Sequence, residues 1–167
     1  EGKKQLEAAQ AELDQKSKPI YEFFALQDQV KLLQLNVNNL SDVFIAQNGS
    51  LNTKQENELK SYEIATSNIL SELKPEAPNY IGQGMLQQRI GSLSLVLKEI
   101  DSGLEKQAID NDILGNYELI KSGQAEIDKN REILESGEKQ IKAGLKQIEE
   151  AREEIADGYK EIENGLE

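Results

Sequence analysis

The chain has 167 residues, 37% of them apolar and 30% charged, and a formal net charge of −12, with no cysteine and no histidine. These absences exclude disulfides, thiolate chemistry, the usual zinc sites and histidine acid–base catalysis. The acidic balance argues against nucleic acid, whose binding needs clustered lysine and arginine. No stretch approaches the roughly 20 apolar residues that cross a bilayer, so we expect no direct membrane insertion by this segment.

The first 19 residues carry the spacing of one arm of a coiled coil. Apolar or small residues recur in alternating steps of four and three, as at heptad positions a and d. Pro19 lacks a backbone donor and clashes with the preceding turn, and the seam changes phase there. We expect a kink or short break at residues 16–19, with Pro19 as a candidate hinge. The recurring residues are Gly2, Leu6, Ala9 and Leu13.

Beyond Pro19 a helix continues to about Ile45, with a wider apolar stripe than one partner helix needs. One interpretation is packing within a small helical bundle. The other is an exposed partner surface that dimerises or holds a peptide or a lipid-like ligand. The stripe consists of Phe23, Leu26, Val30, Leu33, Val37, Leu40 and Phe44.

Turn signals divide the middle of the chain. Residues 48–52 form an Asn-Gly turn, after which Thr53 and Glu56 predict a capping box for a helix ending near Leu73. Residues 75–84 contain two prolines and two glycines and predict a non-helical tip. The candidate contact residues at this tip are Tyr80, Ile81 and Met85.

A third helix should follow from about Leu86, with a phase slip over residues 105–112 that predicts a stutter or a local break around residues 110–112. From Ile113 to Leu166 one heptad then repeats eight times. A branched aliphatic residue occupies position a, and five of the eight d positions are glycine. Because glycine costs a helix roughly 1 kcal/mol relative to alanine, we interpret these glycines as notches that admit the larger side chains of a closely packed neighbouring helix.

Together these elements predict an all-α protein, a long antiparallel coiled-coil hairpin. Residues 1–19 and 113–167 form the paired stalk, and residues 20–112 form a helical head or upper hairpin with its tip at 75–84. The predicted seam comprises Leu6, Ala9, Leu13, Ile120, Gly123, Ile127, Leu134, Gly137, Ile141, Gly144, Ile148, Ala151, Ile155, Gly158 and Ile162.

Two arrangements of the head fit the sequence. If the chain folds back at Pro78 and Asn79, each arm holds about 75 to 80 residues, on the order of 110 to 120 Å at 1.5 Å per residue. In the competing arrangement the helix at residues 53–73 folds down beside its neighbours and makes a three-helix head.

Three runs carry a resemblance to known families: residues 1–13 (EGKKQLEAAQAEL), residues 136–144 (SGEKQIKAG) and residues 155–161 (IADGYKE). They resemble the extracellular coiled-coil insertion of FtsX-like (MacB-type) ABC transporter permeases of Gram-positive bacteria. They are also similar to the glycine-heptad repeats of YhgE/Pip-type membrane proteins and of EsaA in type VII secretion. The resemblance implies an extracellular location and, as partner, the transmembrane remainder of the same chain. It carries over no catalytic residue.

The expected function is therefore mechanical or associative. We expect a non-catalytic stalk that couples or positions a substrate or partner at its tip, with no metal and no cofactor. The acidic pairs at residues 149–150 and 153–154 fit a solvated helix face. The alternative is a dimerising or ligand-binding module, whose partner is a second copy or another membrane or secreted protein. A cytoplasmic scaffold or a secreted helical effector is a third class.

Overall fold

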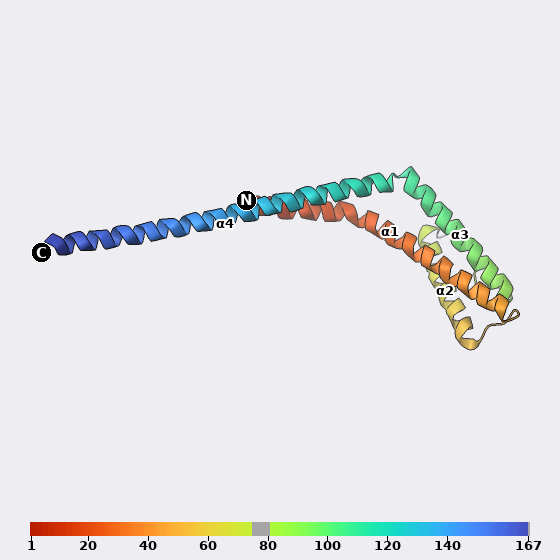
Figure 1. Cartoon of the computed structure of the whole chain (residues 1–167). Coiled ribbons are helices and arrows are strands. Elements are labelled where there is room, and N and C mark those ends of the chain that lie inside the picture. The colour runs from red at the N-terminus through yellow and green to blue at the C-terminus, as the bar shows by residue number, and fades with distance from the viewer. Residues whose placement is uncertain (75–80, 167) are drawn as a thin grey trace. The chain divides into compact units, whose positions relative to one another are not determined.

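The computed structural model describes residues 1–74 and 81–166, and over these residues the protein is all-α, as predicted. Its helices are α1 (Gly2–Ala46), α2 (Thr53–Leu73), α3 (Leu86–Asp110) and α4 (Ile113–Leu166) (Figure 1). The chain divides into two compact units. Unit 1 comprises residues 1–16 and 118–167, and unit 2 comprises residues 17–117.

The end of α1 is set by an Asn-Gly pair in left-handed backbone conformations. Asn48 has a φ of 55° and Gly49 a φ of 81°. The Gly49 amide donates to the carbonyl of Phe44 at 2.8 Å, and the Asn48 amide donates to that of Ile45 at 3.1 Å. This is the Schellman pattern, which satisfies the last carbonyls of a helix while turning the chain away from its axis.

The start of α2 differs by one residue from the prediction. The N-cap is Asn52, whose side-chain oxygen accepts from the Gln55 amide at 2.8 Å. The Gln55 side chain in turn accepts from the Asn52 amide at 2.9 Å. The predicted Thr53–Glu56 box is therefore wrong. Asn52 and Gln55 have the same three-residue spacing, and asparagine is among the best N-cap residues.

In unit 2, α1, α2 and α3 lie side by side (Figure 1). They share one hydrophobic core. The start of α2 lies beside the end of α1, because Gln55 and Gln47 exchange side-chain hydrogen bonds. At the other end of α2, Glu72 lines a shallow hollow together with Pro19 and Phe23 of α1. Thus α2 runs back along α1 and forms a three-helix head. This excludes the arrangement in which residues 53–73 extend the arm. The predicted fold-back at Pro78 and Asn79 lies outside the described residues.

The third helix of the head is antiparallel to α1. Residues near the end of α1, such as Phe44, line one hollow with Ile90 near the start of α3. The opposite end of α3 leads into α4, where Tyr117 stacks edge-on against Phe24 and Tyr21 of α1 with ring centroids 5.2 and 6.2 Å apart. Through these aromatic contacts the first residues of α4, up to Tyr117, pack as part of unit 2.

The break predicted near residues 110–112 is confirmed. Helix α3 ends at Asp110, and Asp112 adopts a left-handed φ of 47°. The Asp112 carboxylate accepts a hydrogen bond from the Gly115 amide at 3.3 Å, so it caps the start of α4. By contrast, α1 is continuous through Pro19. The expected short break at residues 16–19 is absent, and a hinge at Pro19 stays a prediction.

Candidate functional site

The seam of unit 1 pairs residues 2–13 of α1 with residues 123–134 of α4 in antiparallel orientation. A Cβ built on Gly2 would lie 3.4 Å from Cδ1 of Leu134. Further along α1, Gln10 and Gln124 exchange side-chain hydrogen bonds of 2.8 and 2.9 Å. As the residue number rises along α1 it falls along α4, which defines the direction of the pair.

The glycine at position 123 shows why a d-position glycine is useful here. A Cβ added to Gly123 would lie 3.2 Å from Cδ1 of Leu13, closer than ordinary van der Waals contact. Leu13 therefore fills the notch that this glycine leaves open. At the other end of the pair the roles are reversed, with a large Leu134 beside the small Gly2. A large residue faces a small one in both layers, so the helix axes can approach closely without leaving voids.

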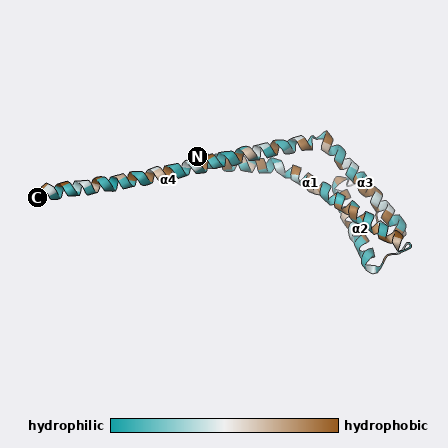
Figure 2. Ribbon diagram, in the orientation of Figure 1, coloured by the Kyte–Doolittle hydropathy of each residue, from teal (hydrophilic) through white to brown (hydrophobic). Residues whose placement is uncertain are grey.

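Beyond Leu134 the predicted seam has no cover among the described residues. Ile120 and Ile127 are buried, whereas the isoleucines at the same heptad position further along α4 are between 56% and 66% exposed. A Cβ added to the later d-position glycines would meet nothing within 4 Å. Hydrophobic residues recur along this uncovered part of α4 (Figure 2). We call it the open seam; it comprises Ile141, Gly144, Ile148, Ala151, Ile155, Gly158, Ile162 and Gly165.

The apolar stripe of α1 packs inside unit 2 and does not face outward as a partner surface. Its members at positions 23, 30, 33, 37 and 40 are buried in the common core, and those at positions 26 and 44 pack against that core. The stripe is wider than one neighbouring helix could cover, and the two helices α2 and α3 together cover it. This replaces the expectation of a dimer or ligand surface on the stripe.

Of the predicted tip residues, the two that the structure describes differ in their exposure. Ile81 is only 8% exposed and belongs to the core of unit 2, where it lines a shallow groove with Glu63 of α2. Met85 is 78% exposed and immediately precedes α3. Tyr80 lies outside the described residues.

An ion pair between α2 and α3 was not predicted from the sequence. Arg89 donates from Nε to Oε2 of Glu63 at 3.1 Å and from Nη2 to Oε1 of the same carboxylate. Glu63 is 6% exposed, and the pair borders a groove of about 550 Å³. The hydrogen bond to Glu63 raises the pKa of Arg89, against the opposing effect of burial. The only hint in the sequence was that the acidic residue Glu63 interrupts the weak apolar pattern of α2.

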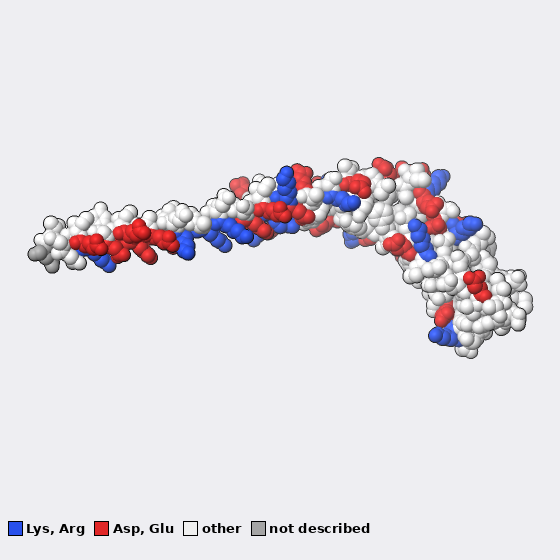
Figure 3. Space-filling view, viewed as in Figure 1, with Lys and Arg blue, Asp and Glu red and all other residues white. Residues whose placement is uncertain are grey.

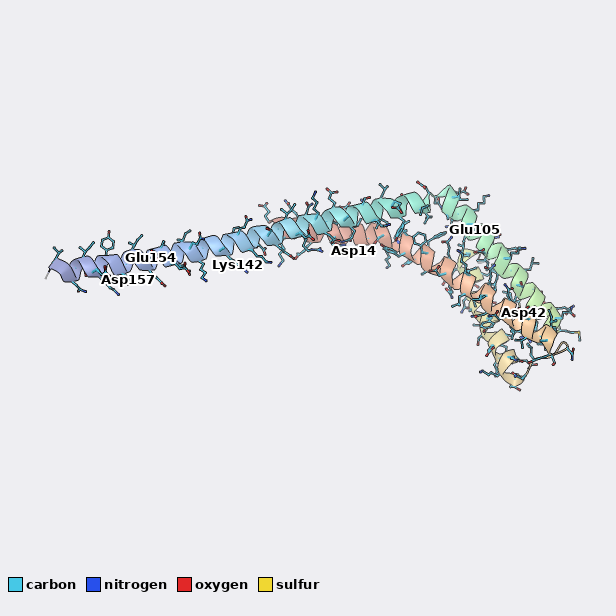
Figure 4. All side chains as sticks on the ribbon, viewed as in Figure 1. Asp14, Asp42, Glu105, Lys142, Glu154 and Asp157 are labelled. Carbon is cyan, nitrogen blue, oxygen red and sulfur yellow. The ribbon has the colours of Figure 1, made fainter. Side chains whose placement is uncertain are left out.

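The charged side chains of α4 face solvent. On the face shown in Figure 3, acidic groups gather toward the C-terminal end of α4 and basic groups lie next to them. Lys142, Glu154 and Asp157 project away from the helix (Figure 4). Among residues 1–74 and 81–166, no group of three acidic side chains is placed to hold a metal ion. In the same residues, none of the helices combines the length and apolarity needed to cross a bilayer.

Comparisons with known proteins give no relative. No protein-family model matches the chain, no curated protein matches it, and no solved structure matches it.

Proposed function

We propose that the protein is a non-catalytic helical stalk domain that stands at the extracytoplasmic face of a membrane ABC transporter permease. Its three-helix head positions a substrate or a partner, and the paired helices of unit 1 join that head to the transmembrane remainder of the same chain. In this proposal Pro19 is the hinge between movements of the membrane segments and the head.

The antiparallel pairing in unit 1 is the observation that supports this function. An antiparallel pair enters and leaves a domain at the same end, which is what an insertion between two segments of a host protein requires. The layers that pack Leu13 against Gly123 and Leu134 beside Gly2 hold the two helices closely together. A close pair is stiffer than either helix alone, and stiffness suits a spacer that transmits position.

Labelling with a membrane-impermeant maleimide tests the location. None of these 167 residues is cysteine, so an introduced cysteine is the only thiol within this domain. In intact cells that make the natural protein, S136C on the exposed face of α4 should react, whereas the matched variant L93C, buried in unit 2, should react only after denaturation. Reaction of S136C only after the cells are permeabilised would place the domain on the cytoplasmic side and contradict the proposal.

A dimerising module of a YhgE/Pip-type or type VII secretion membrane protein is the second candidate function. The eight heptads of α4 favour it, because an apolar seam that recurs every seven residues is typical of helices that associate. Loss of substrate transport from a stalk deletion would favour the permease assignment, whereas intact transport with loss of self-association would favour this alternative.

A further inference from the structure

The charged side chains on the outer side of α4 are sorted by sign. Between residues 135 and 160 they occupy heptad positions b, c and f, which lie farthest from the a and d positions of the open seam. All of them are exposed, and a helix that covered the seam would lie on the opposite side of α4. We call this surface the charge strip; in chain order it comprises Glu135, Lys139, Lys142, Lys146, Glu149, Glu150, Glu153, Asp157 and Lys160.

The order of signs in the strip differs from that of the other exposed charges. Elsewhere, neighbouring opposite charges pair within one helix, as Lys16 does with Glu12 and Arg131 with Asp128. In the strip, a basic block of three lysines within residues 139–146 precedes an acidic block of four residues within 149–157 (Figure 3).

This separation of signs is unfavourable within one helix. Like charges three or four residues apart weaken a helix. Among the residues that the structure describes, no charged group of the strip forms an ion pair. A face ordered in this way is suited to opposite charges that another molecule supplies.

We propose that the charge strip docks against the charge strip of a second copy of this chain, antiparallel to it. A rotation of 180° about a point between residues 147 and 148 brings the basic block of one copy opposite the acidic block of the other. An isologous two-fold contact requires this self-complementarity. The proposal rests on the charge order alone and goes beyond the permease assignment, since it applies to whatever protein carries the domain.

The spacing of the charges selects one register. A shift of one heptad in either direction would place Lys142 opposite Lys160 or Lys146 of the second copy, and a parallel pair would bring like charges together throughout. Like charges that face each other disfavour association. In the selected register the facing groups are Glu135 and Lys160, Lys139 and Asp157, Lys142 and Glu153, and Lys146 with both Glu149 and Glu150.

The dimer should be weak and should depend on salt. Exposed ion pairs contribute little each, so we expect association only at high protein concentration. In sedimentation equilibrium of the whole chain at low salt, the apparent mass should rise with concentration from 18.7 kDa toward twice that value. The rise should be smaller at about 0.5 M salt than at about 20 mM, because salt screens the pairs.

The sign of the salt effect is informative. If the net charge of −12 only kept copies apart, salt would promote association instead of weakening it. An apparent mass that rises with added salt would therefore contradict the proposal. So would a chain that stays monomeric at millimolar concentration in low salt.

Charge reversal tests whether the two blocks face each other. One variant changes the three lysines of the basic block to glutamate, and a second changes the four acids of the acidic block to lysine. Each variant alone should be monomeric, because its two blocks then carry the same sign. An equimolar mixture should associate at least about tenfold more tightly than the unaltered protein, since every facing group is then opposite in sign.

A matched control separates the strip from the net charge. K31E/K98E/K106E lowers the net charge as much as the first variant does, at exposed lysines of unit 2. This control should still associate. Undiminished association of either block variant on its own, or no association in their mixture, would overturn the proposal.

Cysteine crosslinking tests the orientation. In the proposed register Glu138 of one copy lies beside Ala156 of the other, whereas the two copies of Glu138 lie about 19 residues apart, about 28 Å along the axis. A short bis-maleimide should therefore link E138C to A156C in a mixture and should not link E138C to itself. A151C, on the seam side, should give no product.

Two crosslinking results would rule out this dimer. Efficient linkage of E138C to itself would show a parallel pair, and linkage of A151C to itself would show docking through the seam. Either result would count against the proposal even if the maleimide labelling confirmed an extracytoplasmic stalk.

Discussion

At the residue scale, Glu63 and Arg89 form the most constrained polar contact between α2 and α3. Their two hydrogen bonds join a buried carboxylate to a guanidinium that lies at the edge of the core. A pair of this kind contributes chiefly by compensating each partner's loss of hydration, so removing one partner leaves the other buried and uncompensated.

We therefore predict that R89M lowers the free energy of unfolding by about 3 to 5 kcal/mol. The double variant E63L/R89M should recover most of this loss, because an apolar pair of similar volume leaves no unpaired charge. Urea denaturation of both variants and of the unaltered protein is the measurement. Equal losses in the single and the double variant would contradict this account.

The same pair should resist alkali. Its hydrogen bond raises the pKa of Arg89 in the folded protein. A raised pKa gives stability that is complete below the pKa of an unfolded arginine and is lost only as the pH rises through the folded value. The destabilisation caused by R89M should therefore be the same at about pH 7 and about pH 10, since both lie below the ordinary arginine pKa.

Thr66 presents the opposite case, a fully buried hydroxyl. Its Oγ1 has no hydrogen-bond partner among the described residues. An unsatisfied buried hydroxyl is unfavourable, and valine has nearly the same shape. We expect T66V to raise the free energy of unfolding by about 1 kcal/mol, measured by urea denaturation. T53V, at an exposed threonine, is the control and should give no such gain.

At the scale of elements, two variants at the start of α2 distinguish the observed N-cap, Asn52, from the predicted one, Thr53. N52A removes the oxygen that accepts from the Gln55 amide and should destabilise the protein by about 1 kcal/mol. T53A removes the cap that the sequence pattern favoured and should change stability by only a few tenths of a kcal/mol. Thermal unfolding of the two variants provides the comparison, and a larger loss from T53A would restore the predicted cap.

The glycines of α4 give a second prediction at this scale. Alanine in place of an exposed helical glycine should stabilise by about 1 kcal/mol, and G137A should show this gain because its Cβ meets nothing within 4 Å. G123A should gain less or nothing, because its Cβ would press against Leu13. Thermal unfolding monitored by circular dichroism measures both. Equal gains would show that Leu13 yields freely and that the notch has no packing role.

At the scale of the whole molecule, the buried hydrophobic side chains are unevenly distributed between the two units. The hydrophobic core belongs to unit 2, whereas unit 1 buries only a short paired seam. Isolated helices are marginal in water and draw most of their stability from packing. Hydrogen exchange in dilute solution should therefore be slowest in the core of unit 2 and should quicken along α4 from Ile120 to Leu166. Uniform protection along α4 would contradict this gradient.

The sequence determined the helical class, the break at residues 110–112 and the turn at residues 48–52, because heptad spacing and an Asn-Gly pair act through local backbone preferences. It also predicted the role of Gly123, because a glycine at position d improves packing only where a neighbouring helix lies close to it. The helical class, the break and the turn depend on residues within one or two turns of each other, and such patterns can be read along the chain.

Tertiary structure alone decided how the pieces combine. Turn signals at residues 48–52 and 75–84 were compatible both with a long arm and with a folded-back α2. The choice came from burying Leu59 and Ile69 against α1 and α3. The same long-range packing enclosed the stripe of α1 and paired Glu63 with Arg89. Each of these outcomes depends on apolar surface that residues far apart in the chain bury together. The free energy of that burial cannot be read from a local heptad pattern.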